Sequence, residues 1–214
     1  MLRYFLLLPL LVFALFCEAQ DNWTLKTDKE GIAVYMKSLE NSKLKVIRVI
    51  CTLPATPAQL VAVILDVNTG AEWVYSTKSS VLLKKVSPSE LYYYSEVSVP
   101  WPVSNRDFVS HLIATQDPVT KVVTIDGPTL PNYIPPKDGI VRVGERSSGK
   151  WVITARQPRL IHVEYTLQVD PAGSLPAWLV NLFAAKGPFE TFKNLKEQLK
   201  KPAYANVKLP FIVD

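Results

Sequence analysis

The chain has 214 residues, with 24 Lys and Arg against 19 Asp and Glu and a formal net charge of +5. Hydrophobic residues make up 48% of it, and no internal repeat, low-complexity segment or long linker divides it, so one domain with a substantial core is expected. The positive charge favours attraction to anionic surfaces, and because no basic-aromatic binding motif accompanies it, nucleic acid is not an expected partner.

The first nineteen residues have the pattern of an export signal. Residues 1–3 provide a positive start, residues 4–16 are almost wholly apolar, and residues 17–19 form a small-x-small ending. This pattern predicts a secretory signal peptide over 1–19 with cleavage after Ala19, and hence a periplasmic or secreted protein. The apolar run is too short for a transmembrane helix, which needs about 20 residues.

The two cysteines lie on either side of that cleavage point. A lipid anchor on Cys17 is an open alternative, although Phe16 is large for the position before a lipidated cysteine. Cleavage after Ala19 leaves Cys51 as the one cysteine, so an intramolecular disulfide is excluded and the core must hold the fold.

Most of the chain has the period of two that is typical of β-strands. The segments are rich in Val, Ile, Tyr and Thr and are bounded by Gly, Pro, Asn or Asp. In the clearest one, odd positions from Ile161 to Val169 are apolar and the even positions are mostly polar, which predicts an antiparallel strand with one buried face. The predicted strands are 32–36, 43–52, 80–86, 90–99, 107–115, 121–126, 140–145, 150–156 and 160–169.

Two segments between the strands depart from this period. Residues 56–67 predict a helix, with Thr56 as N-cap and Pro57 at the first helical position. Residues 126–137 contain four prolines and predict a long irregular loop.

A helical period replaces the strand period near the C-terminus. Ser174 can cap a helix, and Pro176 fits its first turn. Gly187-Pro188 lies inside the periodic stretch and should kink the helix, because proline removes a backbone hydrogen bond. The predicted domain covers 20–201 and is followed by a tail, 202–214. Apolar residues recur on one face at Trp178, Leu182, Ala185, Phe189, Phe192, Leu195 and Leu199.

A curved antiparallel sheet closed by one long C-terminal helix is an α+β fold of the helix-grip class, which leaves a cavity between sheet and helix. Here the sequence resembles the START domains, the steroidogenic acute regulatory protein-related lipid-transfer family. The resemblance covers roughly residues 25–200. The motifs that carry it are Asp66 with Trp73, Pro100 to Val109 (PWPVSNRDFV), Val141 to Val143, Gly149 to Trp151, and Tyr165 followed by Ser174 to Asn181.

The corner Pro100-Trp101-Pro102 separates two predicted strands. Its prolines lack N–H donors, so they end one strand and preset a tight connection. We expect Trp101 to cover the end of the sheet, and Arg106 and Asp107 to pair with each other or to satisfy loop carbonyls and amides. Catalysis by either of these two residues is the minor alternative.

The sequence shows no convergent catalytic set. His111 and His162 are its only histidines and are far apart in sequence, and Cys51 is interpreted as a small core residue. The sequence has no His/Cys/Asp spacing typical of a metal site, no Gly-rich phosphate-binding loop and no nucleophile elbow. We therefore expect no catalytic residue, no metal and no cofactor.

The resemblance implies one lipid or other hydrophobic molecule in the cavity. Several relatives carry an acid and a base there, and the matching positions in this chain are Tyr93 and Leu112, so Tyr and Ser hydroxyls are the expected polar groups. A solid core is the open alternative. The predicted ligand-binding residues are Tyr93, Ser95, Val97, Phe108, Ser110, Leu112, Trp151, Tyr165, Trp178, Leu182 and Phe183.

These expectations describe an exported, non-enzymatic, monomeric domain that carries or shields its ligand. An enzyme of the helix-grip superfamily, such as a cyclase or hydrolase, and a ligand-sensing module are the alternatives. Transient contact with an anionic membrane is expected from Tyr133-Ile134, at the tip of the long loop, and from the lysines between Lys193 and Lys201.

Overall fold

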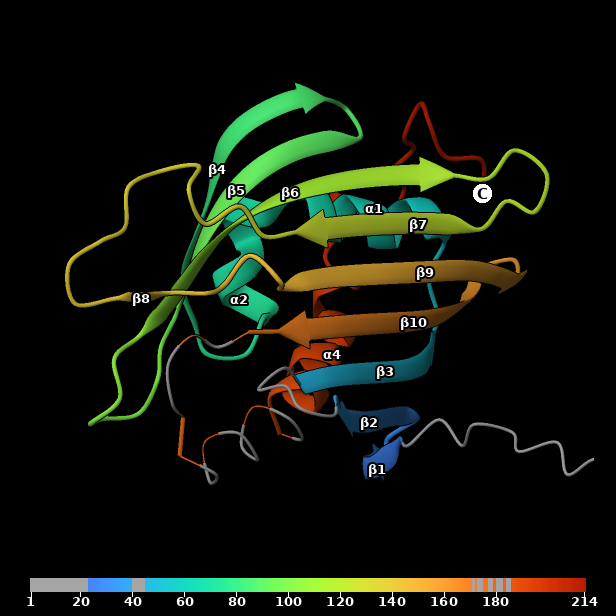
Figure 1. The fold of residues 1–214 in the computed structure, drawn as a ribbon. Helices are drawn as coiled ribbons and strands as arrows, with labels where there is room; N and C mark the ends of the chain where they lie inside the picture. The colour runs from blue at the N-terminus through green and yellow to red at the C-terminus, as the bar shows by residue number, and fades with distance from the viewer. Residues whose placement is uncertain are drawn as a thin grey trace, which may run out of the picture.

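One strongly curved sheet surrounds the helices of this protein in the computed structural model (Figure 1). The structure describes residues 23–39, 45–170, 172, 175–176, 179, 183 and 186–214, so the predicted signal peptide lies outside the described residues. The described strands are β1 (Thr24–Lys29), β2 (Ile32–Ser38), β3 (Lys45–Leu53), β4 (Thr77–Ser87), β5 (Glu90–Val97), β6 (Arg106–Gln116), β7 (Val123–Pro128), β8 (Val141–Arg142), β9 (Ser148–Gln157) and β10 (Leu160–Val169).

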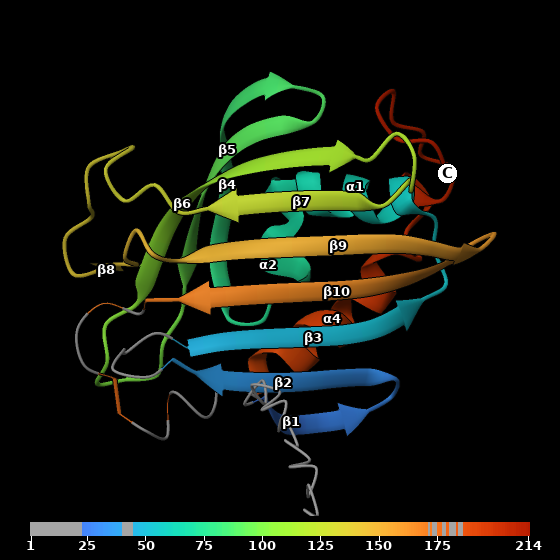
Figure 2. The ribbon, with the colours of Figure 1, turned by 45° about the vertical axis from the view of Figure 1, so that its right-hand side comes forward.

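The strand order is β1-β2-β3-β10-β9-β7-β6-β5-β4, with every pair in this path antiparallel and the short β8 parallel to β6. The described α-helices are α1 (Pro57–Leu65), α2 (Gly70–Trp73) and α4 (Gly187–Gln198), accompanied by 3-10 turns η1 (Val67–Thr69) and η3 (Pro202–Tyr204). All three α-helices lie behind the sheet in Figure 1 and remain behind it in the turned view of Figure 2. The predicted α+β helix-grip architecture is confirmed.

Each of the nine predicted strands overlaps an observed strand. The prediction for 140–145 was too long, since only Val141–Arg142 pairs there. The sequence analysis missed β1, whose residues TLKTDK are polar except for Leu25 and almost all exposed, so this edge strand has no apolar alternation to reveal it.

The predicted start of α1 is confirmed in detail. The Thr56 hydroxyl accepts from the Gln59 N–H at 3.3 Å, and the Gln59 side chain accepts from the Thr56 N–H at 3.0 Å. This capping box satisfies two backbone donors that the helix cannot satisfy by itself.

The C-terminal helix is described fully only from Gly187, where α4 begins. Gly187-Pro188 therefore lies at the start of α4, and most of the predicted helix before it, with Trp178 and Leu182, is outside the described residues. Phe192, Leu195 and Leu199 are buried, as the apolar stripe predicts.

Residues 202–214, predicted as a tail, lie against the domain. The Ala58 N–H donates to the Asp214 carboxylate at 2.9 Å, and the Gln116 side chain hydrogen-bonds both backbone groups of Val213. Tyr204 and Ile212 are buried. This segment therefore closes the end of the core at α1.

The corner between β5 and β6 is held by polar groups. The Glu96 carboxylate accepts from Lys78 and from the Asn105 side chain, both at 2.8 Å, while the Asn105 side-chain oxygen accepts from the Val99 N–H at 3.0 Å. The expectation for Trp101 was wrong. Its side chain is 91% exposed, because the turn carries it beyond the end of the sheet.

A buried ion pair fixes the strand that follows the corner. Asp107, which was expected to pair with Arg106 or a loop group, instead binds Arg142 of β8 through two hydrogen bonds of 2.6 and 3.1 Å. The Arg142 guanidinium also donates to the carbonyl oxygens of Pro131 and Ile134. One side chain thus joins β6, β8 and the proline-rich loop.

We predict that Asp107→Asn destabilises the protein by about 3–5 kcal/mol, because it leaves a buried guanidinium without its counter-ion. Urea denaturation followed by circular dichroism measures the change. Asp107→Leu combined with Arg142→Met should cost less than Asp107→Asn, since it removes both charges. As a control, Lys200→Ala removes an exposed ion pair with Glu197 and should change little. A loss below about 1 kcal/mol in Asp107→Asn would contradict this role for the pair.

Candidate functional site

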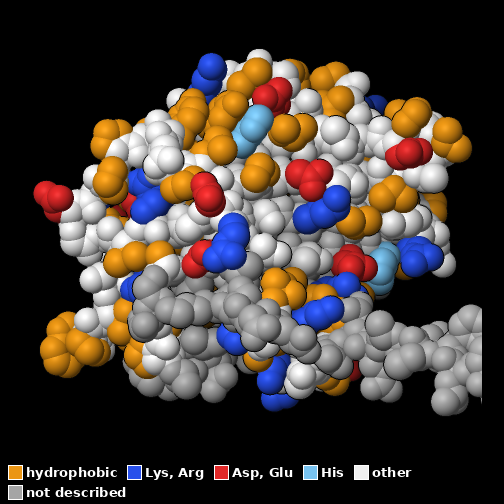
Figure 3. All heavy atoms as spheres, viewed as in Figure 1, with side chains coloured by type: hydrophobic (Ala, Val, Ile, Leu, Met, Phe, Trp, Pro, Cys, Tyr) orange, Lys and Arg blue, Asp and Glu red, His pale blue; other side chains and the backbone are white. Residues whose placement is uncertain are grey.

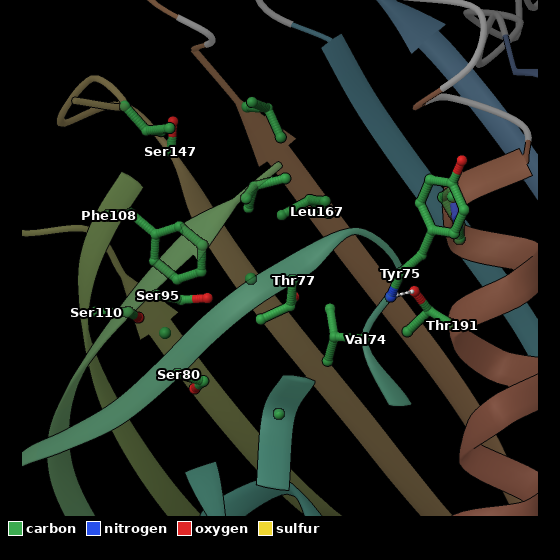
Figure 4. Close-up of a pocket in the computed structure, with 18 of the residues that line it drawn as sticks. Val74, Tyr75, Thr77, Ser80, Ser95, Phe108, Ser110, Ser147, Leu167 and Thr191 are labelled. Atoms are coloured by element: carbon green, nitrogen blue, oxygen red, sulfur yellow. Dashed lines mark hydrogen bonds between the residues drawn. The ribbon is translucent and has the colours of Figure 1, made fainter. Parts of the chain in front are cut away.

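An apolar cavity of about 360 Å³ lies between the concave face of the sheet and the helices. Strands β3 to β7, β9 and β10 contribute to its wall, together with α2, the connection after it and α4. In the close-up, Phe108, Ser95 and Ser110 project from adjacent strands into one space, with Leu167 on another wall (Figure 4). The volume lies within the range of small-molecule sites, which begins at about 300 Å³.

The structure places the predicted residues together. Trp178 and Leu182 lie outside the described residues. The predicted residues that line the cavity are Tyr93, Ser95, Val97, Phe108, Ser110, Leu112, Trp151, Tyr165 and Phe183. Strand alternation accounts for this arrangement, because every second residue of β5 and β6 points to the concave face. Contact of these residues with a ligand stays a prediction.

Aromatic rings fill much of the wall. Trp151 packs against Tyr165 and Phe192, with ring centroids 4.3 and 5.4 Å apart, and Tyr93 meets Phe108 edge-on at 5.7 Å. Such contacts are worth more than the area they bury. They make the wall firm as well as apolar.

The hydroxyl groups in the cavity differ in whether their donor is already used in a hydrogen bond. Ser95 donates to the Ser79 carbonyl at 3.2 Å and Ser110 to the Pro128 carbonyl at 3.1 Å, so both of these donors are occupied. The Tyr93 and Tyr165 hydroxyls have no hydrogen bond among the described residues, and burial raises the pKa of both phenols. Both remain protonated donors at neutral pH.

The sequence analysis did not assign the guanidinium of Arg106 to the wall. Its side chain lines the cavity and the residue is 9% exposed. Its Nη1 donates to the Ser104 carbonyl, as expected for a loop contact, but its buried Nε has no partner among the described residues. The alternation of β6 could have revealed this position, since Arg106 shares the parity of Phe108, Ser110 and Leu112.

The histidines lie away from this cavity. Nε2 of His111 is 2.7 Å from a Glu90 carboxylate oxygen, and its ring stacks on Tyr92 at 4.1 Å. His162 is on β10 but does not line the cavity. Within the described ranges, no cluster of three or more His, Cys, Asp or Glu side chains could hold a metal ion.

The loop predicted to reach a membrane is fastened to the sheet. Tyr133 stacks on Tyr92 with ring centroids 4.8 Å apart and is 40% exposed, while Ile134 is half-buried and its carbonyl binds Arg142. This part of the loop therefore packs on the domain, and its contact with a membrane stays a prediction.

Comparisons with known proteins agree on one family. The profile of the START domain matches residues 10–203. The chain is 32% identical over 187 residues to an uncharacterized protein of Pseudomonas aeruginosa, covering 85% of this chain and 88% of that protein. It is 28% identical to the mouse phosphatidylcholine transfer protein, covering 84% and 83%. The crystal structure of a STAR-related lipid transfer protein from Xanthomonas axonopodis matches with a TM-score of 0.76 and 35% identity, covering 85% of this chain and all of that one.

Cys51 provides a test of the core behind the cavity. It is 3% exposed, and burial raises its pKa to about 12, against a smaller opposite effect of Lys196. At pH 8 only about one thiol in ten thousand is then a thiolate. We predict that a thiol-reactive chromophore labels Cys51 only after unfolding, in a Cys17→Ser variant where Cys51 is the one cysteine. Fast stoichiometric labelling of the folded protein would contradict the burial.

Proposed function

This chain belongs to the START domain family, and we propose that it binds one molecule of lipid, or of another hydrophobic compound, in its cavity. The observation that carries the proposal is the cavity itself, a largely apolar chamber to which sheet and helix both contribute. The lipid-transfer relatives support the same reading, because two of those named above are described as transferring phosphatidylcholine or lipid.

The chemistry of the wall favours binding over catalysis. Reaction with a bound molecule needs a nucleophile or base next to it. Among the described residues, neither histidine nor Cys51 lines the cavity, and the hydroxyls of Ser95 and Ser110 donate to backbone carbonyls and not to a base. The one carboxylate in the described wall, that of Asp66, accepts from the Tyr204 hydroxyl. The remaining groups can orient a ligand by hydrogen bonds.

The carrier role and the site of action are further parts of this proposal. The predicted signal peptide supports action outside the cytoplasm, in the periplasm or after secretion. None of the helices in the described part of the chain is both long and apolar enough to span a membrane. We infer a monomeric carrier that meets membranes transiently.

We propose the corner Pro100-Trp101-Pro102 as the contact with a membrane. Trp101 is 91% exposed, and Figure 3 shows hydrophobic side chains projecting at the lower left, where Figure 1 places the tip between β5 and β6. Tryptophan is favoured at the boundary between lipid and water.

The lysines near the end of α4 are weaker candidates for this contact. Lys193 lies 3.8 Å from a Glu30 carboxylate oxygen, Lys200 pairs with Glu197, and Lys201 pairs with Glu72. Acidic neighbours therefore offset much of the positive charge that the sequence shows there.

A cavity ligand predicts a specific effect of filling the space. Val97→Trp adds a ring inside the wall and should lower the loading of a fluorescent phosphatidylcholine at least about tenfold, because the lipid and the ring compete for one volume. The melting temperature should stay within a few degrees. Val81→Trp is the matched control, since Val81 is 48% exposed on β4 and lines no part of the cavity. Equal loading of all three proteins would exclude this cavity as the site.

A membrane contact at the corner predicts that Trp101→Ala reduces binding to phosphatidylglycerol vesicles about tenfold or more, because a large apolar side chain no longer leaves water. Vesicle co-sedimentation measures it. Val119→Ala is the control, since Val119 is 86% exposed in the connection between β6 and β7. If Ile134→Asp weakened binding and Trp101→Ala did not, the contact would lie in the proline-rich loop.

A further inference from the structure

The charge inside the cavity is unbalanced near Arg106. Arg106 is buried, with 9% of the residue exposed, and no described carboxylate forms an ion pair with it. The neighbouring acid, Asp107, points to the other face of β6 and is held there by Arg142. Burial alone lowers the Arg106 pKa, with no opposing effect from an acid.

The other charged residues of the wall do not compensate this cation. Asp66 lines the cavity, but its carboxylate forms no ion pair with Arg106 and accepts from the neutral Tyr204 hydroxyl at 2.8 Å instead. Lys45, also in the wall, donates to the Ser38 hydroxyl at 2.9 Å and carries the same sign as Arg106. Among the described residues, the Arg106 guanidinium is therefore a buried charge without a counter-ion.

The free polar groups of the wall share one chemical character. Nε of Arg106 and Nε1 of Trp73 are buried donors without an acceptor among the described residues, and the phenols of Tyr93 and Tyr165 add two further hydroxyl donors. A buried donor that stays unpaired costs free energy, and an unpaired charge costs more. A ligand with acceptor oxygens and a negative charge removes both costs.

We propose that the cavity ligand is an anionic amphiphile whose acidic group, a carboxylate or a phosphate, binds Arg106 while its apolar part occupies the rest of the chamber. This rests on the proposed lipid-binding function and adds the chemical class of the ligand. The planar guanidinium fork suits either acid, because both present two oxygens to parallel N–H donors. A neutral oxygen would satisfy a donor but would leave the charge uncompensated.

Three single-chain probes separate these possibilities on the full protein, freed of co-purified lipid. They are hexadecanoic acid, hexadecyl phosphate and hexadecanol, which have the same chain length and differ in the head. Native mass spectrometry and competition titration at pH 8 give their relative affinities. We expect at least one acid to bind about tenfold or more tightly than the alcohol, the gain typical of a charged hydrogen bond. The acid that binds better identifies the source, a fatty acid or a phosphate headgroup.

Variants then assign the preference to its residue. Arg106→Gln should remove the preference for the acid while hexadecanol still binds, and Arg106→Lys should restore part of it, because the charge returns without the fork. Arg156→Gln is the matched control, since it removes the same charge from an exposed position on β9 that does not line the cavity. Melting temperatures of all variants separate loss of binding from loss of fold.

The outcomes are distinct. If hexadecanol binds the parent protein as tightly as both acids, the anionic class is wrong and the lipid-binding function stands. If the preference survives in folded Arg106→Gln, Arg106 is not the anion site. If no probe and no phospholipid enters the cavity, the proposed function fails as well. The comparison in the parent protein needs no variant, so it remains decisive even if Arg106→Gln does not fold.

Discussion

The buried ion pair between Asp107 and Arg142 is the constraint on which the geometry of the site depends. It commits the Asp107 carboxylate to the outer face of β6, and the alternation of the strand then directs the neighbouring residue inward. Arg106 consequently enters the cavity wall without an acid to neutralise it. The same Arg142 donates to carbonyls of the proline-rich loop, so it also holds this loop to the sheet.

The cavity persists because the neighbouring packing is tight. A Cβ atom on Gly127 would come within 2.8 Å of Leu112, and one on Gly149 within 3.2 Å of the Tyr165 hydroxyl. These glycines let β7 and β9 approach side chains that would otherwise be pushed into the open volume. The rings of Trp151, Tyr165 and Phe192 then support each other beside the space. Collapse of the wall into the cavity would break these ring contacts. The close packing around the cavity therefore keeps it open.

The strands and the capped helix could be predicted because each carries a local signal. Alternation in Leu160 to Val169, and Thr56 followed by Pro57, specify structure within a few residues. The exposure of Trp101 could not be predicted from the sequence. Whether its side chain covers the end of the sheet depends on the direction in which the turn leaves the strand. Arg142, the partner of Asp107, lies 35 residues away in the sequence, and no local sequence pattern predicts such a contact. Arg106 was read as part of the corner, although its parity already placed it with the inward residues.

A chamber whose buried cation has no counter-ion among the described residues, and whose volume the side chains do not fill, is costly to the folded state for two physical reasons. The volume forfeits dispersion contacts, and the guanidinium has lost water without gaining a counter-ion. A ligand that supplies both the dispersion contacts and the counter-ion stabilises the folded state as a core side chain does. Since it binds the folded chain and not the unfolded one, it stabilises the fold by about 2.7 kcal/mol at a concentration one hundred times its dissociation constant. Release of the ligand then returns the protein to its less stable form. If the proposed ligand binds in this way, loading and folding are linked through the same few groups, with Arg106 on the polar side of the ligand and the aromatic wall on its apolar side.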